Sequence, residues 1–262
     1  MFLAEPAATP YDLNFRLFGI RVRIVPWFWL VALLLGWDLT NSDQRALLLT
    51  LWVGAVFLSI LVHEMGHALA MRFYGMHSYI VLYQFGGLAI PEQYSSFLGH
   101  GGRRSREDPI SQIVISAAGP VAQLALALAI ALSLELSGFR MRAGVPYLEY
   151  LLPLQEGRQI GSFPLELLLY FLMLTSVLWA LLNLLPVYPL DGGQIARNVF
   201  TLFHPAGGIR YSLILSIVTG VAIAVYAFSR DDWFLAIMFG MLAYSSFQIL
   251  QAYSGRGGYG PW

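Results

Sequence analysis

The chain has 262 residues, of which 58% are hydrophobic and 11% are charged. A soluble domain carries about 25% charged residues, so this composition excludes an ordinary soluble protein and predicts a multi-pass integral membrane protein. Arginine supplies all 15 basic side chains, which balance 15 acids, and a net charge of zero argues against nucleic acid as a partner. Because there is no cysteine, any metal must be held by nitrogen and oxygen ligands.

Residues 1–25 are predicted to form a cytoplasmic N-terminal lead that contains one edge strand. Residues 18–25 alternate apolar and charged side chains, and this period of two is typical of a strand with its arginines on the wet face. The apolar run over 26–40 is short for a membrane helix, which needs about 20 residues. A longer apolar run predicts the second helix, over 46–74.

A hairpin is predicted after the second helix, over 78–91. Tyrosines and β-branched residues flank Gly86-Gly87 there, as in two strands joined by a turn. The segment is too apolar for an ordinary loop and too short for a helical span. This favours a re-entrant hairpin buried by protein at membrane depth, with an interfacial loop as the alternative.

Four further helices are predicted, over 110–137, 165–185, 211–228 and 233–250. The fold class is therefore an all-α polytopic membrane protein of about six transmembrane helices, with a short re-entrant hairpin and edge strand. Residues 26–250 are expected to form one membrane-embedded domain and 251–262 a flexible tail. Ten arginines lie on the side of the termini and five on the opposite side, so the positive-inside rule places the termini in the cytoplasm.

One motif within the second helix has the residues for metal chemistry: His63-Glu64-Met65-Gly66-His67, an H-E-x-x-H. Residues four apart share one face of a helix, so the two imidazoles can take two corners of a zinc tetrahedron. Glu64 lies beside them, where its carboxylate can deprotonate a zinc-bound water. A charged residue costs a membrane helix about 2.5–3.5 kcal/mol, so ionisable residues there are usually functional. The motif falls near the predicted cytoplasmic end of its helix.

Asp191 is a candidate third ligand. Pro186 and Pro189 end the fourth predicted helix, and Gly192-Gly193 permits a tight turn, so Asp191 is expected on irregular backbone near the same membrane depth. The alternative is that Asp191 caps a short helix over 192–203, which aspartate does well. The residues alone leave both possibilities open.

The two motifs together resemble the site-2 protease family of intramembrane zinc metalloproteases. H-E-x-x-H is followed by N-x-x-P-x-x-P-L-D-G-G over 183–193, and the Gly86-Gly87 hairpin, Gly119-Pro120 and the Gly19-Ile20 strand also fit. The resemblance implies one zinc ion per chain bound by His63, His67 and Asp191, with Glu64 as general base and acid. It also implies a compact form that lacks the PDZ and CBS modules of some relatives.

The same resemblance gives roles to residues around the expected metal. Asn183 is expected to contact the substrate backbone or the oxyanion, for which an amide donor is suited, although a helix–helix hydrogen bond is the alternative. Gly86 and Gly87 are expected to bind the substrate as an added strand. Gln123 stands where relatives commonly have asparagine. The longer amide can keep the hydrogen bonding, so we expect this difference to affect the packing of that helix rather than the metal.

The predicted function is hydrolysis of a peptide bond in or near the transmembrane segment of a membrane-protein substrate, as in regulated intramembrane proteolysis. Membrane lipid is an expected partner, and a regulatory membrane partner remains open. One alternative is a membrane protease whose third ligand is a glutamate, for which Glu135 and Glu166 are available. The other is a non-catalytic metal-binding scaffold or a transporter.

Overall fold

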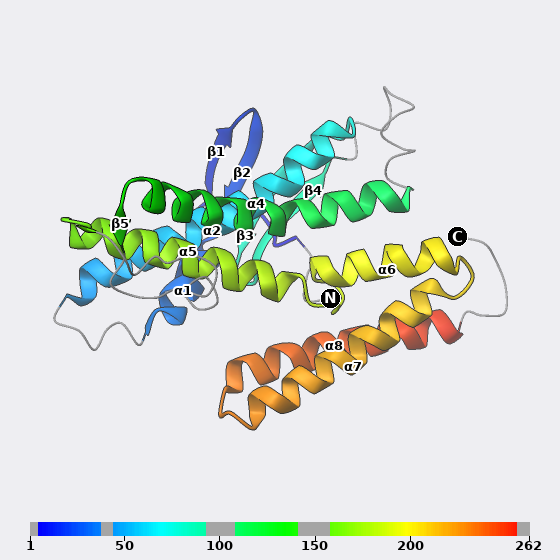
Figure 1. Cartoon of the computed structure of the whole chain (residues 1–262). Coiled ribbons are helices and arrows are strands. Elements are labelled where there is room, and N and C mark those ends of the chain that lie inside the picture. Colours follow the sequence, from blue (N-terminus) through cyan, green and yellow to red (C-terminus); the bar gives the residue numbers. More distant parts are fainter. Residues whose placement is uncertain (1–4, 38–43, 93–107, 141–157, 256–262) are drawn as a thin grey trace. The chain divides into compact units, whose positions relative to one another are not determined.

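The computed structural model describes residues 5–37, 44–92, 108–140 and 158–255, which are mostly helical and include one small four-stranded sheet (Figure 1). The first elements are β1 (Leu13–Leu17), β2 (Ile20–Ile24), α1 (Pro26–Leu35), α2 (Arg45–Phe73), β3 (Ser78–Tyr83) and β4 (Gly86–Pro91). They are followed by α4 (Pro109–Leu136), β5 (Phe139–Arg140), β6 (Arg158–Gln159), α5 (Phe163–Asn183), α6 (Asp191–Phe203), α7 (Gly208–Phe228) and α8 (Trp233–Gly255). The chain forms two compact units: one comprises Phe2–Ser95 with Ala118–Leu181, and the other comprises Ser96–Ala117 with Leu182–Trp262.

The first unit contains the sheet, whose strands lie in the order β1-β2-β3-β4. β1 and β2 are antiparallel, β2 and β3 are parallel, and β3 and β4 are antiparallel with Tyr83 opposite Gly86. The hairpin predicted over 78–91 is therefore present, but its turn is formed by Gln84 and Phe85, and Gly86 and Gly87 belong to β4. The strand predicted at 18–25 is an interior strand and not an edge, because residues 13–17 form an additional strand outside it.

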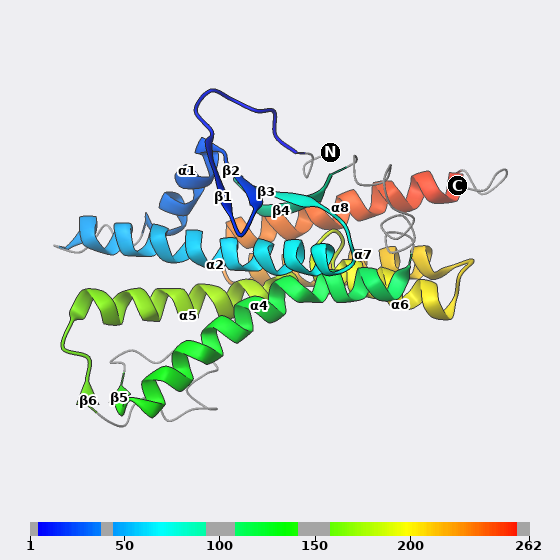
Figure 2. The same cartoon turned by 90° about the horizontal axis from the view of Figure 1, so that it is seen from above.

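One face of this sheet packs on α2. Successive side chains of a strand point to opposite faces of the sheet. Val22 and Ile24 of β2 and Ile80 and Leu82 of β3 lie on the face that contacts α2, and they are at most 1% exposed. They form a core with α1 and with the buried face of α2, including Ile60, Leu61, Met65 and Ala68. Seen from above, α2 runs between the sheet and α5 (Figure 2). The sheet thus supports the helix that carries the H-E-x-x-H.

A second core of the same unit joins α4 to α5. Ala127, Ala131 and Leu134 of α4 pack against Met173 and Val177 of α5. Small side chains on α4 let the two helices lie close together, as is common in membrane proteins.

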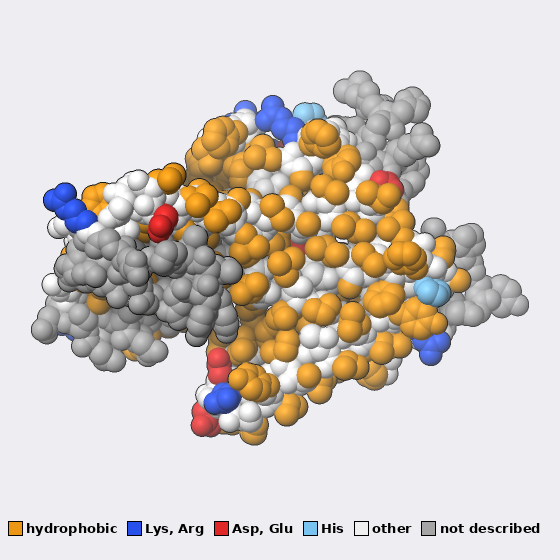
Figure 3. Space-filling model, in the orientation of Figure 1, with side chains coloured by type: hydrophobic (Ala, Val, Ile, Leu, Met, Phe, Trp, Pro, Cys, Tyr) orange, Lys and Arg blue, Asp and Glu red, His pale blue; other side chains and the backbone are white. Residues whose placement is uncertain are grey.

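The second unit contains α6 and the antiparallel pair α7 and α8, which lie side by side in both views (Figures 1 and 2). A Cβ at Gly220 of α7 would lie 3.1 Å from the Cβ of Ala243 on α8, so small residues set this distance as well. Hydrophobic side chains cover the length of the pair, and the charged side chains lie at its ends (Figure 3).

Five of the described helices are long and apolar enough to cross a membrane: α2, α4, α5, α7 and α8. The sixth predicted span corresponds to α1, which has 10 residues. Such a helix is shorter than the hydrocarbon core that a span must cross, so α1 is not counted among the candidate spans. The protein is an integral membrane protein.

One predicted boundary is wrong. The tail was predicted to begin at residue 251, but α8 continues to Gly255. Gln251 and Ala252 are good helix formers, so nothing at the predicted boundary ends the helix. The remainder of the predicted tail lies outside the described residues.

Candidate metal centre

His63, Glu64 and His67 are buried on α2, with 3%, 4% and 7% of their surface exposed. The Nε2 atoms of the two imidazoles lie 3.1 Å apart, and the ring planes cross at 80°. Three ionisable side chains on an otherwise apolar helix are costly unless each is paired or functional. The spacing of four residues stacks the two rings on one side of the helix, so that one ring nitrogen of each points at the other.

Glycines bring α2 and α4 into close contact at this point. A Cβ at Gly66 would collide with the backbone carbonyl of Ala118 and would lie 2.9 Å from the Cβ of Ala122. A Cβ at Gly119 would collide with Nε2 of His67 and would lie 2.8 Å from Nε2 of His63. The absence of a side chain at Gly119 of α4 therefore makes the space in which both rings lie.

Gln123 lies one turn after Gly119 and contacts His63 directly. Its Oε1 is 2.8 Å from Nδ1 of His63, and the Gln123 side chain is fully buried. The longer amide therefore does make a hydrogen bond, and its partner is a histidine that is expected to bind the metal. The spacing of four between Gly119 and Gln123 was the available signal, since it places both residues on the same face of the helix.

The hairpin strand β4 packs against Glu64. A Cβ at Gly87 would lie 2.6 Å from the carboxyl carbon of Glu64, and a Cβ at Gly86 would lie 2.6 Å from the indole of Trp179. Burial and then the neighbouring Glu64 carboxylate raise the pKa of Tyr83, on the adjoining strand, above its usual value. The two glycines thus let a strand lie directly on the candidate catalytic carboxylate; substrate binding by them remains a prediction.

Asp191 is the first residue of α6, immediately after an irregular connection that contains Pro186 and Pro189. Leu190 is the N-cap, so the predicted alternative that Asp191 occupies the capping position does not describe this helix. Gly192 and Gly193 are helical. A Cβ on either would collide with the backbone of the connection, so these glycines serve close packing and not the predicted tight turn.

Serines of α7 and α8 hold this connection in place. The backbone N–H of Tyr188 donates to Oγ of Ser216 at 2.8 Å, and Oγ of Ser246 donates to the carbonyl of Tyr188 at 3.2 Å. Irregular backbone at membrane depth needs such partners because lipid supplies none. The position of Asp191 is therefore set by hydrogen bonds within its own unit.

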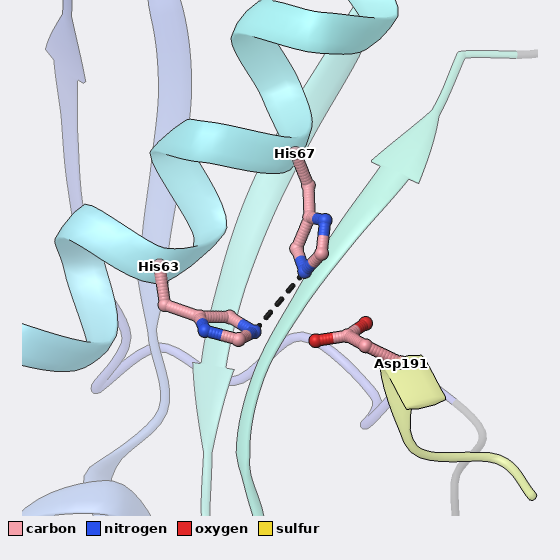
Figure 4. A group of neighbouring side chains, drawn as sticks. All are labelled: His63, His67 and Asp191. Carbon is pink, nitrogen blue, oxygen red and sulfur yellow. Dashed lines mark hydrogen bonds between the residues drawn. The ribbon is translucent and has the colours of Figure 1, made fainter. Parts of the chain in front are cut away.

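One group of at least three His, Asp or Glu side chains within the described residues has ligand atoms close enough for a shared metal. It consists of His63, His67 and Asp191, whose ligand atoms lie within 4.8 Å of one another (Figure 4). Glu135 and Glu166, the alternative third ligands, do not belong to this group. Asn183 is the last residue of α5 and is half-buried; its contact with substrate remains a prediction.

Replacing Gly119 by alanine should displace the two histidines, because the new methyl group would occupy the space of both Nε2 atoms. We expect the zinc affinity of Gly119→Ala to fall by at least about tenfold. Mutations of residues that support metal ligands typically lower metal affinity by about 10–100-fold, and tenfold is the lower limit of that range. Gly54→Ala on α2 is the matched control, since a Cβ there meets nothing within 4 Å. Zinc titration of both purified variants checks the prediction, and equal affinities would contradict it.

The chain was compared with protein families and curated proteins. The model of peptidase family M50 matches residues 52–227. The putative zinc metalloprotease sll0528 of Synechocystis is 29% identical over 193 residues, which are 70% of this chain and 42% of that protein. Stage IV sporulation protein FB of Bacillus subtilis is 28% identical over 183 residues, which are 70% of this chain and 48% of that protein. The chain thus spans about half the length of the curated relatives it matches.

Among solved structures, the site-2 protease from Methanocaldococcus jannaschii is similar in fold. The TM-score is 0.53 at 20% identity, and the match covers 92% of this chain and 95% of that one. The family match extends over about two thirds of the sequence and includes both the H-E-x-x-H and Asp191. The resemblance to site-2 proteases is therefore confirmed, and the chain belongs to peptidase family M50.

Proposed function

We propose that this chain is an intramembrane zinc metalloprotease that hydrolyses a peptide bond in or near the transmembrane segment of a membrane-protein substrate. The observation that carries the proposal is the group of two imidazoles and one carboxylate, with Glu64 beside the imidazoles on the same apolar helix. Membership in peptidase family M50 supports the same activity. A scaffold or a transporter would not need a buried carboxylate next to the two histidines.

The donor set of this group fits zinc. Two nitrogen ligands and one oxygen ligand leave a fourth tetrahedral position open, which is the pattern of catalytic zinc sites. Tetrahedral geometry with Zn–N distances of about 2.0–2.1 Å places two nitrogen ligands roughly 3.3 Å apart. The Nε2 atoms of His63 and His67 lie 3.1 Å apart, close to that separation. We propose that His63, His67 and Asp191 hold one zinc ion per chain.

Bound zinc would supply Lewis acidity for attack on a peptide carbonyl. Glu64 would take up the proton of the attacking water on its carboxylate and deliver it to the leaving amine. The apolar surroundings of Glu64 limit bulk water at this carboxylate, which strengthens its electrostatic interactions. Gly87 would keep the backbone of β4 next to Glu64, because no side chain separates them.

The substrate would bind as an extended strand. Among the described residues β4 is the last strand of the sheet order, so its outer edge would be available to a peptide. Strand addition there would bring a substrate backbone alongside the residue that packs on Glu64. Asn183 would donate its amide to the substrate backbone or to the developing oxyanion.

Zinc content tests the ligand set. We expect about one zinc per chain in the purified wild type and a loss of zinc in Asp191→Ala, because two histidines alone leave the coordination incomplete. His67→Ala is the positive control for ligand loss, and Ser133→Ala on α4 is the neutral control. Atomic absorption on the four samples measures the result. If Asp191→Ala retained its zinc, another residue would be the third ligand.

Glu64→Gln tests the catalytic role. The amide keeps the shape of the side chain but cannot accept the proton of water, so we expect cleavage to fall by about 10²–10⁴-fold while zinc remains bound. Single-pass membrane proteins mixed with the enzyme in detergent, with fragments detected by mass spectrometry, provide the assay. Cleavage at the wild-type rate by zinc-loaded Glu64→Gln would refute this role.

We also propose that the termini and the active site face the cytoplasm, on the basis of the arginine distribution. The chain has no cysteine, so single cysteines report on sidedness directly. Phe18→Cys at the exposed β1–β2 turn should react with a membrane-impermeant maleimide only in permeabilised cells. Ser229→Cys at the exposed end of α7 should react in intact cells. The reverse labelling pattern would invert the proposed topology.

A further inference from the structure

A buried hydrogen-bond network links three helices next to the candidate metal centre. Ser59 and His63 of α2, Gln123 of α4 and Ser176 of α5 are each at most 3% exposed. Nε2 of Gln123 donates to the backbone carbonyl of Ser59 at 3.1 Å and to Oγ of Ser59 at 2.9 Å. Oγ of Ser59 lies 3.0 Å from Oγ of Ser176. All four residues belong to the first compact unit.

The network fixes the orientation of the Gln123 amide. A backbone carbonyl can only accept a hydrogen bond, so the atom of Gln123 that faces Ser59 must be the NH₂ group. A flipped amide would place two oxygen atoms against each other in an apolar interior, which costs free energy because neither can find water. Oε1 of Gln123 must therefore face His63.

The orientation of the amide in turn determines the tautomer of His63. Oε1 of Gln123 accepts hydrogen bonds and cannot donate them, so Nδ1 of His63 carries the hydrogen of their 2.8 Å bond. In a neutral imidazole with its hydrogen on Nδ1, the lone pair lies on Nε2. Nε2 is the atom of His63 that faces Nε2 of His67.

We propose that Gln123 is a positioning residue that fixes His63 as an Nε2 metal ligand, and that Ser59 holds Gln123 in the required orientation. The role of His63 as a metal ligand rests on the proposed zinc function. The tautomer of His63 does not, because it is a property of the metal-free protein. Gln123 accepts the Nδ1 hydrogen without adding a second buried negative charge, which a carboxylate in the same place would do.

The first measurement reads the tautomer without any metal. Long-range ¹H–¹⁵N spectra of the zinc-free full-length chain, labelled with ¹⁵N-histidine, distinguish a protonated Nδ1 from a protonated Nε2. The His63 signals are identified by their loss in His63→Gln. We expect wild-type His63 to be protonated on Nδ1, and Gln123→Met, which keeps the side-chain length but lacks the amide, to lose this preference. Wild-type His63 protonated on Nε2 would overturn the proposal.

The second measurement reads metal affinity by competition between the protein and a chromogenic chelator for Zn²⁺. We expect Gln123→Met to bind zinc about 10–100-fold more weakly, as is usual when the partner of a histidine ligand is lost. Gln123→Glu retains an acceptor for Nδ1 but places a carboxylate oxygen against the Ser59 carbonyl, so it should recover only part of the affinity. Ser133→Ala, on the same helix but exposed, should bind like the wild type. Wild-type affinity in Gln123→Met would overturn the proposal.

The two measurements separate the two proposals. A wild type that never binds zinc, with His63 still protonated on Nδ1 and this preference lost in Gln123→Met, would refute the zinc function and leave the positioning role intact. The tautomer of His63 in the zinc-free variants distinguishes positioning from a general packing defect, since a packing defect alone does not move the hydrogen away from Nδ1. If Gln123→Met does not fold, Gln123→Leu replaces it, because its apolar side chain also lacks the amide.

Discussion

Two helix backbones can approach each other closely only where the side chains between them are absent, and the candidate metal centre depends on this constraint. α2 and α4 meet where Gly66 faces Ala118 and where Gly119 leaves room for two imidazole rings. The same crossing brings Gln123 within hydrogen-bond distance of His63. The ring positions are therefore set by the packing of two helices, before any metal binds, and a site supported in this way is pre-organised.

The apolar surroundings explain the hydrogen bonds on both sides of the site. A buried polar group without a partner costs about 1–3 kcal/mol, and lipid offers no substitute for water. In the first unit, the side chains of Ser59 and Gln123 satisfy each other and His63. In the second unit, Ser216 and Ser246 satisfy the backbone of the connection that leads to α6. The same hydrogen bonds that remove these costs also fix the orientation of the groups that make them.

The sequence predicted the long helices, the hairpin and the metal-ligand candidates because each rests on a local pattern: an apolar run, tyrosines and β-branched residues around a Gly-Gly, or a four-residue spacing. The Gly-Gly itself is part of β4 and not the turn. Leu13–Leu17 does alternate apolar and polar side chains, but five residues are a short window, and the pairing of β1 with β2 is what identifies it as a strand. Hydrogen bonding by Gln123 could be expected from its amide, but not its partner His63, because the two residues lie 60 positions apart in the sequence. Gly192-Gly193 was assigned to a turn, since sequence alone does not distinguish a glycine needed for its backbone angles from one needed for space.

Helical glycines at these contacts also limit how stable the protein can be. Gly66, Gly119, Gly192 and Gly193 all lie within helices, where glycine is about 1 kcal/mol less favourable than alanine. At an unconstrained position such as Gly54 that loss is recoverable by substitution, but at these four an added methyl group would meet backbone or imidazole atoms. Replacing glycine by alanine can therefore stabilise these helices only away from the site. The helix turns next to the site keep a lower helix propensity than the rest of the same helices.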